Sequence, residues 1–138
     1  MAGASRDSDP AYRRAHISEV PSLASDLVEA EWKPVRYHFG ISGFDVNGYV
    51  GQREGELVVE EDADSEHERL YVVLAGTARF VVAGDTFEAA AGTLVFVPTN
   101  VERGAWAGEP GTVVLAIGAP PGALRVSDWE RRRLPAGA

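Results

Sequence analysis

From residue 35 onward, hydrophobic and polar positions alternate over short runs that glycine-containing turns separate. The runs are rich in Val, Phe, Tyr and Thr, and no helical periodicity persists for ten residues, which is typical of half-buried strands. The pattern predicts strands at 35–39, 43–50, 56–60, 68–75, 77–82, 85–88, 93–97, 102–107 and 112–118. Many short antiparallel strands at this spacing indicate an all-β sandwich or barrel.

Two tight connections in the middle of the chain fit hairpin turns. Gly76 alone separates two of the predicted strands, and Ala83 and Gly84 separate the next two. Both connections require a glycine at positive φ. Between them, residues 77–82 alternate strictly, so this strand is expected to have one buried face, formed by Ala78, Phe80 and Val82.

The sequence divides into a disordered N-terminus, an N-terminal arm, a β-barrel and a C-terminal tail, at residues 1–11, 12–34, 35–120 and 121–138. The first segment is small, polar and charged, a composition typical of disorder. Within the arm, Pro21 followed by Ser22 favours a short helix through Leu23, Leu27 and Val28. Pro34 is expected to end this helix, because the residue before a proline is pushed towards extended geometry.

The C-terminal tail contains a helix-start signal. Ser127 and Glu130 have the spacing of a capping box and predict a short helix, with Arg131, Arg132 and Arg133 as its last charges. Cations at a helix C-terminus complement the helix dipole, so we interpret these arginines as a solvated helix end.

Composition excludes several classes of function. The 138 residues suffice for one domain, and the formal net charge of −8 disfavours binding to nucleic acid or to anionic membranes. There is no cysteine, which excludes disulfides, thiolate catalysis and thiolate metal sites. No apolar run approaches the ~20 residues of a membrane span, and the first residues lack the pattern of a secretory signal. We therefore expect a cytoplasmic protein without a membrane or nucleic-acid partner.

Two stretches resemble the sequence motifs of the cupin superfamily. Residues 67–76, HERLYVVLAG, are similar to the second half of the first cupin motif, and residues 91–98, AGTLVFVP, are similar to the start of the second. The short linker between them matches that of small bacterial single-domain cupins. The resemblance implies a double-stranded β-helix, that is, a jelly-roll barrel of two facing antiparallel sheets.

The residues by which cupins usually bind a metal ion are missing. The resemblance implies three histidines and one glutamate, but Arg69 stands at the glutamate position and Arg103 at the last histidine position. The first two histidine positions fall on Ala63 and Ser65, or on Asp62 and Asp64 in the longer spacing. A guanidinium group has only donors and cannot ligate a cation. We therefore predict a barrel without metal or other cofactor, in which Arg69 and Arg103 bind a small anionic molecule.

Period-two alternation extends this predicted site. It places His67, Arg69 and Tyr71 on one strand face, which the resemblance implies points into the barrel. The predicted ligand-binding residues are therefore Arg69, Arg103, His67 and Tyr71. On the strand that starts near Arg103, Ala105 and Ala107 share the inner face and are expected to leave space for a ligand, while Trp106 points outward.

Three alternatives remain open at this point. Arg69 could form a structural ion pair with an acidic residue such as Glu68, Asp62 or Glu102, in a closed barrel whose surface carries the function. An enzyme could use His67 and Tyr71 for acid–base chemistry, as a metal-free isomerase or lyase. A metal-dependent enzyme could use atypical ligands, namely Asp62, Asp64 and His67.

The opposite face of the 68–75 strand predicts self-association. Leu70, Val72 and Leu74 lie on this face and must be covered. Since cupins resemble one another in pairing through an outer sheet face, we expect a two-fold symmetric homodimer.

Overall fold

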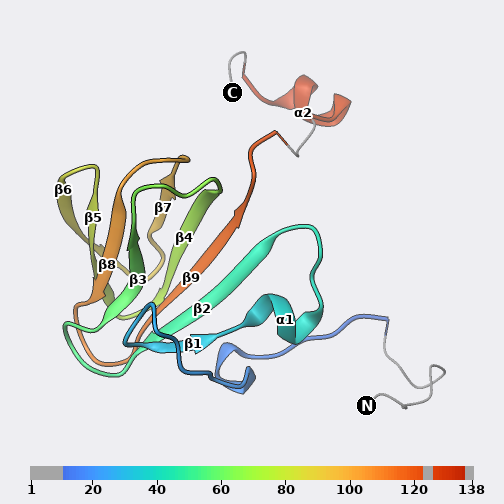
Figure 1. Ribbon diagram of the computed structural model, residues 1–138. Helices are drawn as coiled ribbons and strands as arrows, with labels where there is room; N and C mark the ends of the chain where they lie inside the picture. The colour runs from blue at the N-terminus through green and yellow to red at the C-terminus, as the bar shows by residue number, and fades with distance from the viewer. Residues whose placement is uncertain (1–10, 123–125, 136–138) are drawn as a thin grey trace.

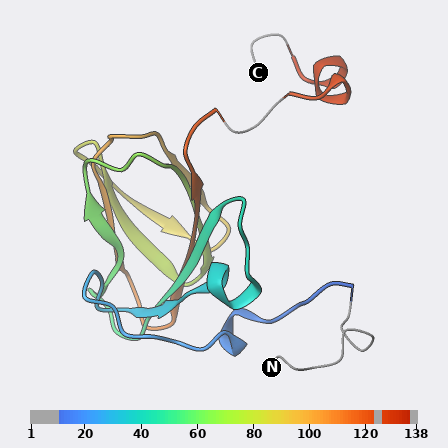
Figure 2. The same cartoon turned by 45° about the vertical axis from the view of Figure 1, so that its right-hand side comes forward.

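The computed structural model describes residues 11–122 and 126–135, and in this part of the chain two antiparallel sheets face each other (Figures 1 and 2). The five-stranded sheet has the order β1 (Glu31–Lys33), β2 (Asp45–Gly51), β9 (Thr112–Ala119), β4 (Glu68–Ala75), β7 (Leu94–Val97). The four-stranded sheet has the order β3 (Leu57–Asp62), β8 (Arg103–Ala107), β5 (Thr77–Val82), β6 (Asp85–Ala90). The predicted all-β jelly-roll architecture is confirmed.

Eight of the nine predicted strands form within two residues of the predicted bounds. The predicted β5–β6 hairpin is also present, with Val82 paired to Asp85 around a two-residue turn. Ala83 (φ 52°) and Gly84 (φ 85°) both adopt the left-handed conformation that such a turn needs. Ala78 and Phe80 are fully buried, as the alternation along β5 predicts, whereas Val82 is only half-buried.

The predicted strand at 35–39 is wrong, because these residues form a short helix, α1 (Val35–Phe39). Gly40 ends the helix in the left-handed conformation (φ 71°), and its N–H donates to the carbonyl of Arg36. A proline directly before the helix and a glycine directly after it are ordinary helix boundaries. These two signals outweigh the strand propensity of the aromatic residues between them.

The helix predicted from Pro21 is wrong as well. The arm, all of which the structure describes, contains a three-residue 3-10 helix, η2 (Ile17–Glu19), as its only helix. It then forms an irregular loop with bends, closed by the antiparallel pairing of Leu23 with Trp32. The Ser25 hydroxyl accepts a hydrogen bond from the Leu27 N–H (3.0 Å), a local turn that competes with helix. The arm therefore folds back on itself as an irregular loop, and Leu23 pairs with β1 at the edge of the five-stranded sheet.

The predicted C-terminal helix is confirmed as α2 (Asp128–Arg133). The Ser127 hydroxyl accepts from the Glu130 N–H, and the Glu130 carboxylate accepts from the Ser127 N–H. The Ser127 N–H, and after it the Ser127 hydroxyl, donate hydrogen bonds to the Glu130 carboxylate and so lower the pKa of Glu130. The disorder predicted for 1–11 concerns residues that, apart from residue 11, lie outside the described part of the chain. None of the described helices is long and apolar enough to span a membrane.

The hydrophobic core lies between the two sheets. Both sheets contribute its largest fully buried side chains: Val58, Phe80, Val73, Val97 and Val114. The core stops short of one end of the barrel, where β2, β4 and β8 begin and β3 and β9 end. At that end, polar side chains replace the apolar ones.

Candidate functional site

A cavity of about 50 Å³ lies between the sheets at the polar end of the barrel. Its lining comes from β2, β3, β4, β8 and β9: Asn47, Tyr49, Val59, Glu60, Asp62, Arg69, Tyr71, Arg103 and Ala116. Two cationic, two acidic and two phenolic side chains thus surround a space that holds a few water molecules or one small ion.

Arg69 reaches its partner across a glycine. In the five-stranded sheet, Gly118 of β9 lies between Asp45 of β2 and Arg69 of β4. The Arg69 Nη1 donates to the Asp45 Oδ2 at 3.2 Å. A Cβ atom at Gly118 would lie 2.8 Å from the Cδ of Arg69, so the glycine makes room for this side chain. Arg69 therefore forms its ion pair with Asp45. The partners suggested from the sequence, Glu68, Asp62 and Glu102, were wrong.

Arg103 is held more firmly than Arg69. It is only 2% exposed, and its guanidinium donates three hydrogen bonds. Nε donates to the Val101 carbonyl (2.7 Å), Nη2 to the Pro98 carbonyl (3.0 Å) and Nη1 to the Tyr71 hydroxyl (3.2 Å). No carboxylate within the described residues forms a salt bridge with Arg103. Its positive charge is therefore positioned by neutral groups and remains available to the cavity.

Two carboxyl groups of β3 share the cavity with the arginines. Burial raises the pKa of Glu60, and the neighbouring Asp62 raises it further, whereas Arg69 and Arg103 oppose this shift. A raised pKa means that Glu60 binds a proton more readily than an exposed glutamate does. In its protonated form the Glu60 carboxyl group can donate a hydrogen bond. Protonation also removes one negative charge, which leaves the cavity with a net positive charge.

The two tyrosines supply neutral donors. Burial, with the Glu60 carboxylate as the next cause, raises the pKa of Tyr49 to about 12. Burial also raises the pKa of Tyr71, although Arg103 opposes the shift through its charge and its hydrogen bond. Both hydroxyls therefore stay protonated at neutral pH. Because the Tyr71 oxygen accepts from Arg103, its own hydrogen remains free to donate to a ligand.

The structure brings together three of the four predicted site residues. Arg69, Tyr71 and Arg103 line the cavity, whereas His67 precedes β4 and lies outside the lining. The expectation that Ala105 and Ala107 leave space for a ligand is wrong, because both are buried members of the hydrophobic core. Trp106 points outward as predicted, and the Arg79 guanidinium lies 5.9 Å from its ring centroid.

No three His, Asp or Glu side chains in the described part of the chain are grouped so that they could hold a metal ion. The alternative metal site of Asp62, Asp64 and His67 is therefore not formed. Instead, the Asp62 Oδ1 accepts a hydrogen bond from the Asp64 N–H (2.9 Å) in a local turn.

Comparison with solved structures identifies the fold. A cupin protein from Bacteroides fragilis is 15% identical, with a TM-score of 0.66 over 88% of this chain and 95% of its own. KdgF from Halomonas sp. is 16% identical, with a TM-score of 0.60 over 75% of this chain and 90% of its own. The chain has the cupin fold. The Streptomyces nucleoside dehydratase Pac13 is also similar, at 15% identity and a TM-score of 0.58 over 79% of this chain and 82% of its own. No protein-family model and no curated protein matches the sequence.

The usual metal ion of cupins does not fit the residues of this barrel. Arg69 and Arg103 both line the cavity, as their positions in the cupin motifs imply. Two permanent cations without a lone pair to donate to a metal ion would repel it there.

Several residues of the site were missed in the sequence. Asp45, Asn47 and Tyr49 occupy alternate, inward-facing positions of β2, and Glu60 faces them from β3. The signal was the alternation of β2 itself, in which every second residue is polar and the residues between are Val46, Gly48 and Val50. It could not be interpreted without knowing which face of β2 points inward.

Proposed function

We propose that this cupin-fold protein binds a small molecule through its carboxylate or phosphate group inside the barrel, with Arg69 and Arg103 as the main recognition groups. The observation that carries the proposal is that both guanidinium groups line one cavity. They reach it from opposite sheets, Arg69 from β4 and Arg103 from β8. An oxyanion between them would accept charge-assisted hydrogen bonds from two sides.

The donors around the cavity suit an oxyanion. Arg69 uses one nitrogen for Asp45, and among the described residues its other N–H groups have no hydrogen-bond partner. The hydroxyls of Tyr71 and Tyr49 add neutral donors. A volume of about 50 Å³ admits one such group, whereas a drug-sized ligand needs at least ~300 Å³. The remainder of a larger ligand would extend out of the open end.

The proposal is tested by titrating the protein with sulfate, whose charge is constant across the neutral pH range. We expect Arg69→Met to weaken sulfate binding about ten- to a hundredfold, because a charge-assisted bidentate contact contributes about 1.5–3 kcal/mol. Arg53→Met is the matched control, since Arg53 is exposed and pairs with Glu56 outside the cavity. Equal affinities of the wild type and Arg69→Met would disprove the proposal.

A second candidate function is a metal-free isomerase or lyase, which the raised pKa of Glu60 favours. A carboxyl group with a raised pKa beside Tyr71 and two arginines is suited to proton transfer on an anionic substrate. Glu60 takes the place predicted for His67, which lies outside the cavity lining. If this function is correct, the wild-type protein in heavy water will replace a carbon-bound hydrogen of its anionic substrate by deuterium, whereas Glu60→Gln will not. NMR detects this exchange.

We also propose that the protein forms a homodimer through the outer face of the five-stranded sheet. On strands β9, β4 and β7, the outward positions between the strand ends are all apolar: Leu70, Val72, Leu74, Leu94, Phe96, Val113, Leu115 and Ile117. Leu94 is 63% exposed and Phe96 is 58% exposed. A second copy related by a two-fold axis would cover this face with the same face of its own sheet.

A further inference from the structure

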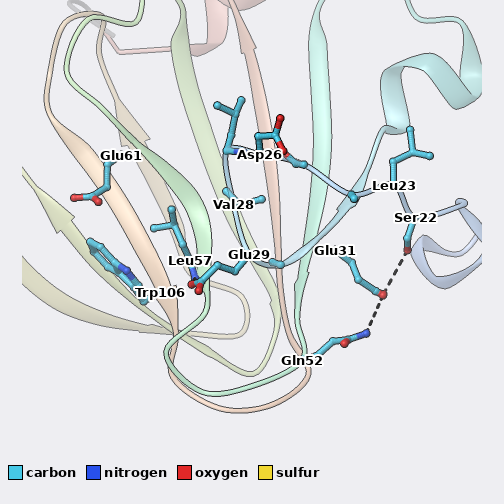
Figure 3. A pocket seen from close by; sticks show the side chains of 14 residues that line it. Ser22, Leu23, Asp26, Val28, Glu29, Glu31, Gln52, Leu57, Glu61 and Trp106 are labelled. Atoms are coloured by element: carbon cyan, nitrogen blue, oxygen red, sulfur yellow. Dashed lines mark hydrogen bonds between the residues drawn. The ribbon is translucent and has the colours of Figure 1, made fainter.

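A groove of about 880 Å³ lies on the outside of the barrel, between the arm loop 22–31 and the outer side of β3 and β8 (Figure 3). Leu57 and Trp106, which are paired across these two strands, form its apolar floor together with Val28. On the rim, Leu27 of the arm is 65% exposed. The groove is separate from the cavity, because Glu61 points to the groove whereas Glu60 and Asp62 line the cavity.

The walls of the groove are acidic. Four carboxylates line it, and no basic residue does: Asp26, Glu29, Glu31 and Glu61. Glu29 accepts from the Leu57 N–H (3.1 Å) and Glu31 from the Gln52 amide (3.1 Å), so both are fixed in place. Within the described part of the chain, none of the four forms a salt bridge. An apolar floor with uncompensated negative walls fits a segment that carries both arginines and a large apolar side chain.

The C-terminal tail of this chain has that chemistry. Residues 123–138 contain four arginines and two acidic residues, a charge of +2, whereas residues 1–122 contain nine basic and nineteen acidic residues, a charge of −10. On and around α2, the large apolar side chains are exposed: Val126, Trp129 and Leu134. The Arg133 guanidinium lies 4.7 Å from the ring centroid of Trp129. The helix stands clear of both sheets (Figures 1 and 2).

We propose that the α2 segment of one copy, residues 126–134, docks into the acidic groove of a second copy. Its arginines would pair with the carboxylates of the groove, and its apolar side chains would cover Leu57 and Trp106. The tail leaves its own barrel after Ala119, at the end of β9, and α2 lies beyond that end, away from the arm segment 22–31 (Figures 1 and 2). This placement favours the groove of a second copy over that of the same chain.

Because the chain has no cysteine, single cysteines can report on this contact without background. One chain carries Leu27→Cys on the groove rim, and another carries Arg132→Cys on α2, where both native side chains are exposed. A disulfide forms only where two Cα atoms approach within about 7 Å. In the mixed sample under mild oxidation, we expect the 27–132 disulfide to form at least about five times faster than the 37–132 disulfide made with Tyr37→Cys. Tyr37 is a matched control because it is 71% exposed and lies on α1, outside the groove.

The charges are tested in the same assay, with cross-linked peptides identified by mass spectrometry. Glu61→Lys and added salt should both slow the 27–132 cross-link, whereas Glu88→Lys, an exposed site on β6, should not. Equal rates for Leu27→Cys and Tyr37→Cys, or no response to Glu61→Lys, would overturn the proposal. A chain with both cysteines that cross-links internally at high dilution would also overturn it, because the tail would then occupy its own groove.

Discussion

The two faces of the five-stranded sheet have opposite polarity, in the reverse of the usual arrangement. Along β4, Arg69 and Tyr71 face the barrel interior, whereas Leu70 and Val72 face outward. The adjacent β9 continues the apolar outer face with Leu115. Strands at the surface of a monomer normally direct apolar side chains inward and polar ones towards water.

On the inner face of the sheet, the polar side chains are confined to one end of the barrel. On the outer face, the apolar side chains extend across three strands, β9, β4 and β7. Further along β4, Val73 is fully buried in an ordinary apolar core. The inner polar end therefore does not replace the core but adds a site to it. The outer apolar face is a second unusual surface, of a different kind. We infer that a small polar molecule occupies the inner site and that another copy of the chain covers the outer one.

The largest effect is expected when charge is placed on the outer face. Leu94→Glu combined with Phe96→Glu should raise the Kd of the proposed homodimer by on the order of a thousandfold or more, because each lost apolar side chain contributes about 1.5–3 kcal/mol. Sedimentation equilibrium measures the change. Tyr37→Glu, at an exposed site on α1, is the control that should leave the dimer intact. A wild-type protein that is monomeric at micromolar concentration would contradict this prediction.

The next largest effect is expected inside the barrel. Arg103→Met should lower the free energy of unfolding by about 2–4 kcal/mol, because it leaves the Val101 and Pro98 carbonyls and the Tyr71 hydroxyl without their donor. Chemical denaturation measures the loss. Arg79→Met, which removes an exposed arginine beside Trp106, should cost much less. Equal losses for the two variants would mean that Arg103 is not held as the structure shows.

The fold could be predicted from the sequence where local patterns and motif resemblance agree, as in residues 68–82. The incorrect predictions concern two segments in which the helix or strand propensity of the residues competes with other signals. These signals are helix-boundary residues in one segment and pairing with a neighbouring strand in the other. Residues 35–39 have strand-forming side chains, but Pro34 and Gly40 fix helix boundaries around them. Residues 21–28 carry a helix-start signal, but their backbone is recruited by the edge of the sheet at Trp32.

The site could be predicted only in part, for a similar reason. The motif positions identified Arg69 and Arg103, and alternation then added Tyr71. The ion pair between Asp45 and Arg69 depends on two strands that are far apart in sequence and on Gly118 between them. Such a contact follows from strand order and register, which no local pattern contains.

A smaller effect is expected from pH, and it distinguishes the inner site from a generally basic surface. Because burial raises the pKa of Glu60 above 4.5, its protonated form persists at a higher pH than that of an exposed glutamate. Sulfate binding should therefore strengthen as the pH falls from 7 towards 4.5, and Glu60→Gln should bind sulfate well at all pH values in this range. By linkage, ionisation of Glu60 as the pH rises destabilises the fold, so Glu60→Gln should also be more stable than the wild type at pH 7. Calorimetric titration and thermal unfolding measure the two effects, and parallel pH profiles of the two proteins would contradict the assignment.

The smallest effect is expected for Tyr71→Phe, which removes one hydroxyl from the inner site and leaves the aromatic ring in the core. The hydroxyl accepts from Arg103 at 3.2 Å and has its hydrogen free for a ligand, so its loss should weaken sulfate binding about fivefold, equivalent to about 1 kcal/mol. The ring packs against Phe80, 5.9 Å away between centroids, and this contact survives the change. Dimerisation should be unaffected, because the outer neighbours Leu70 and Val72 are untouched. A Tyr71→Phe protein with unchanged sulfate affinity would restrict the inner site to its two arginines, whereas an altered dimer would show that the two faces of the sheet are coupled.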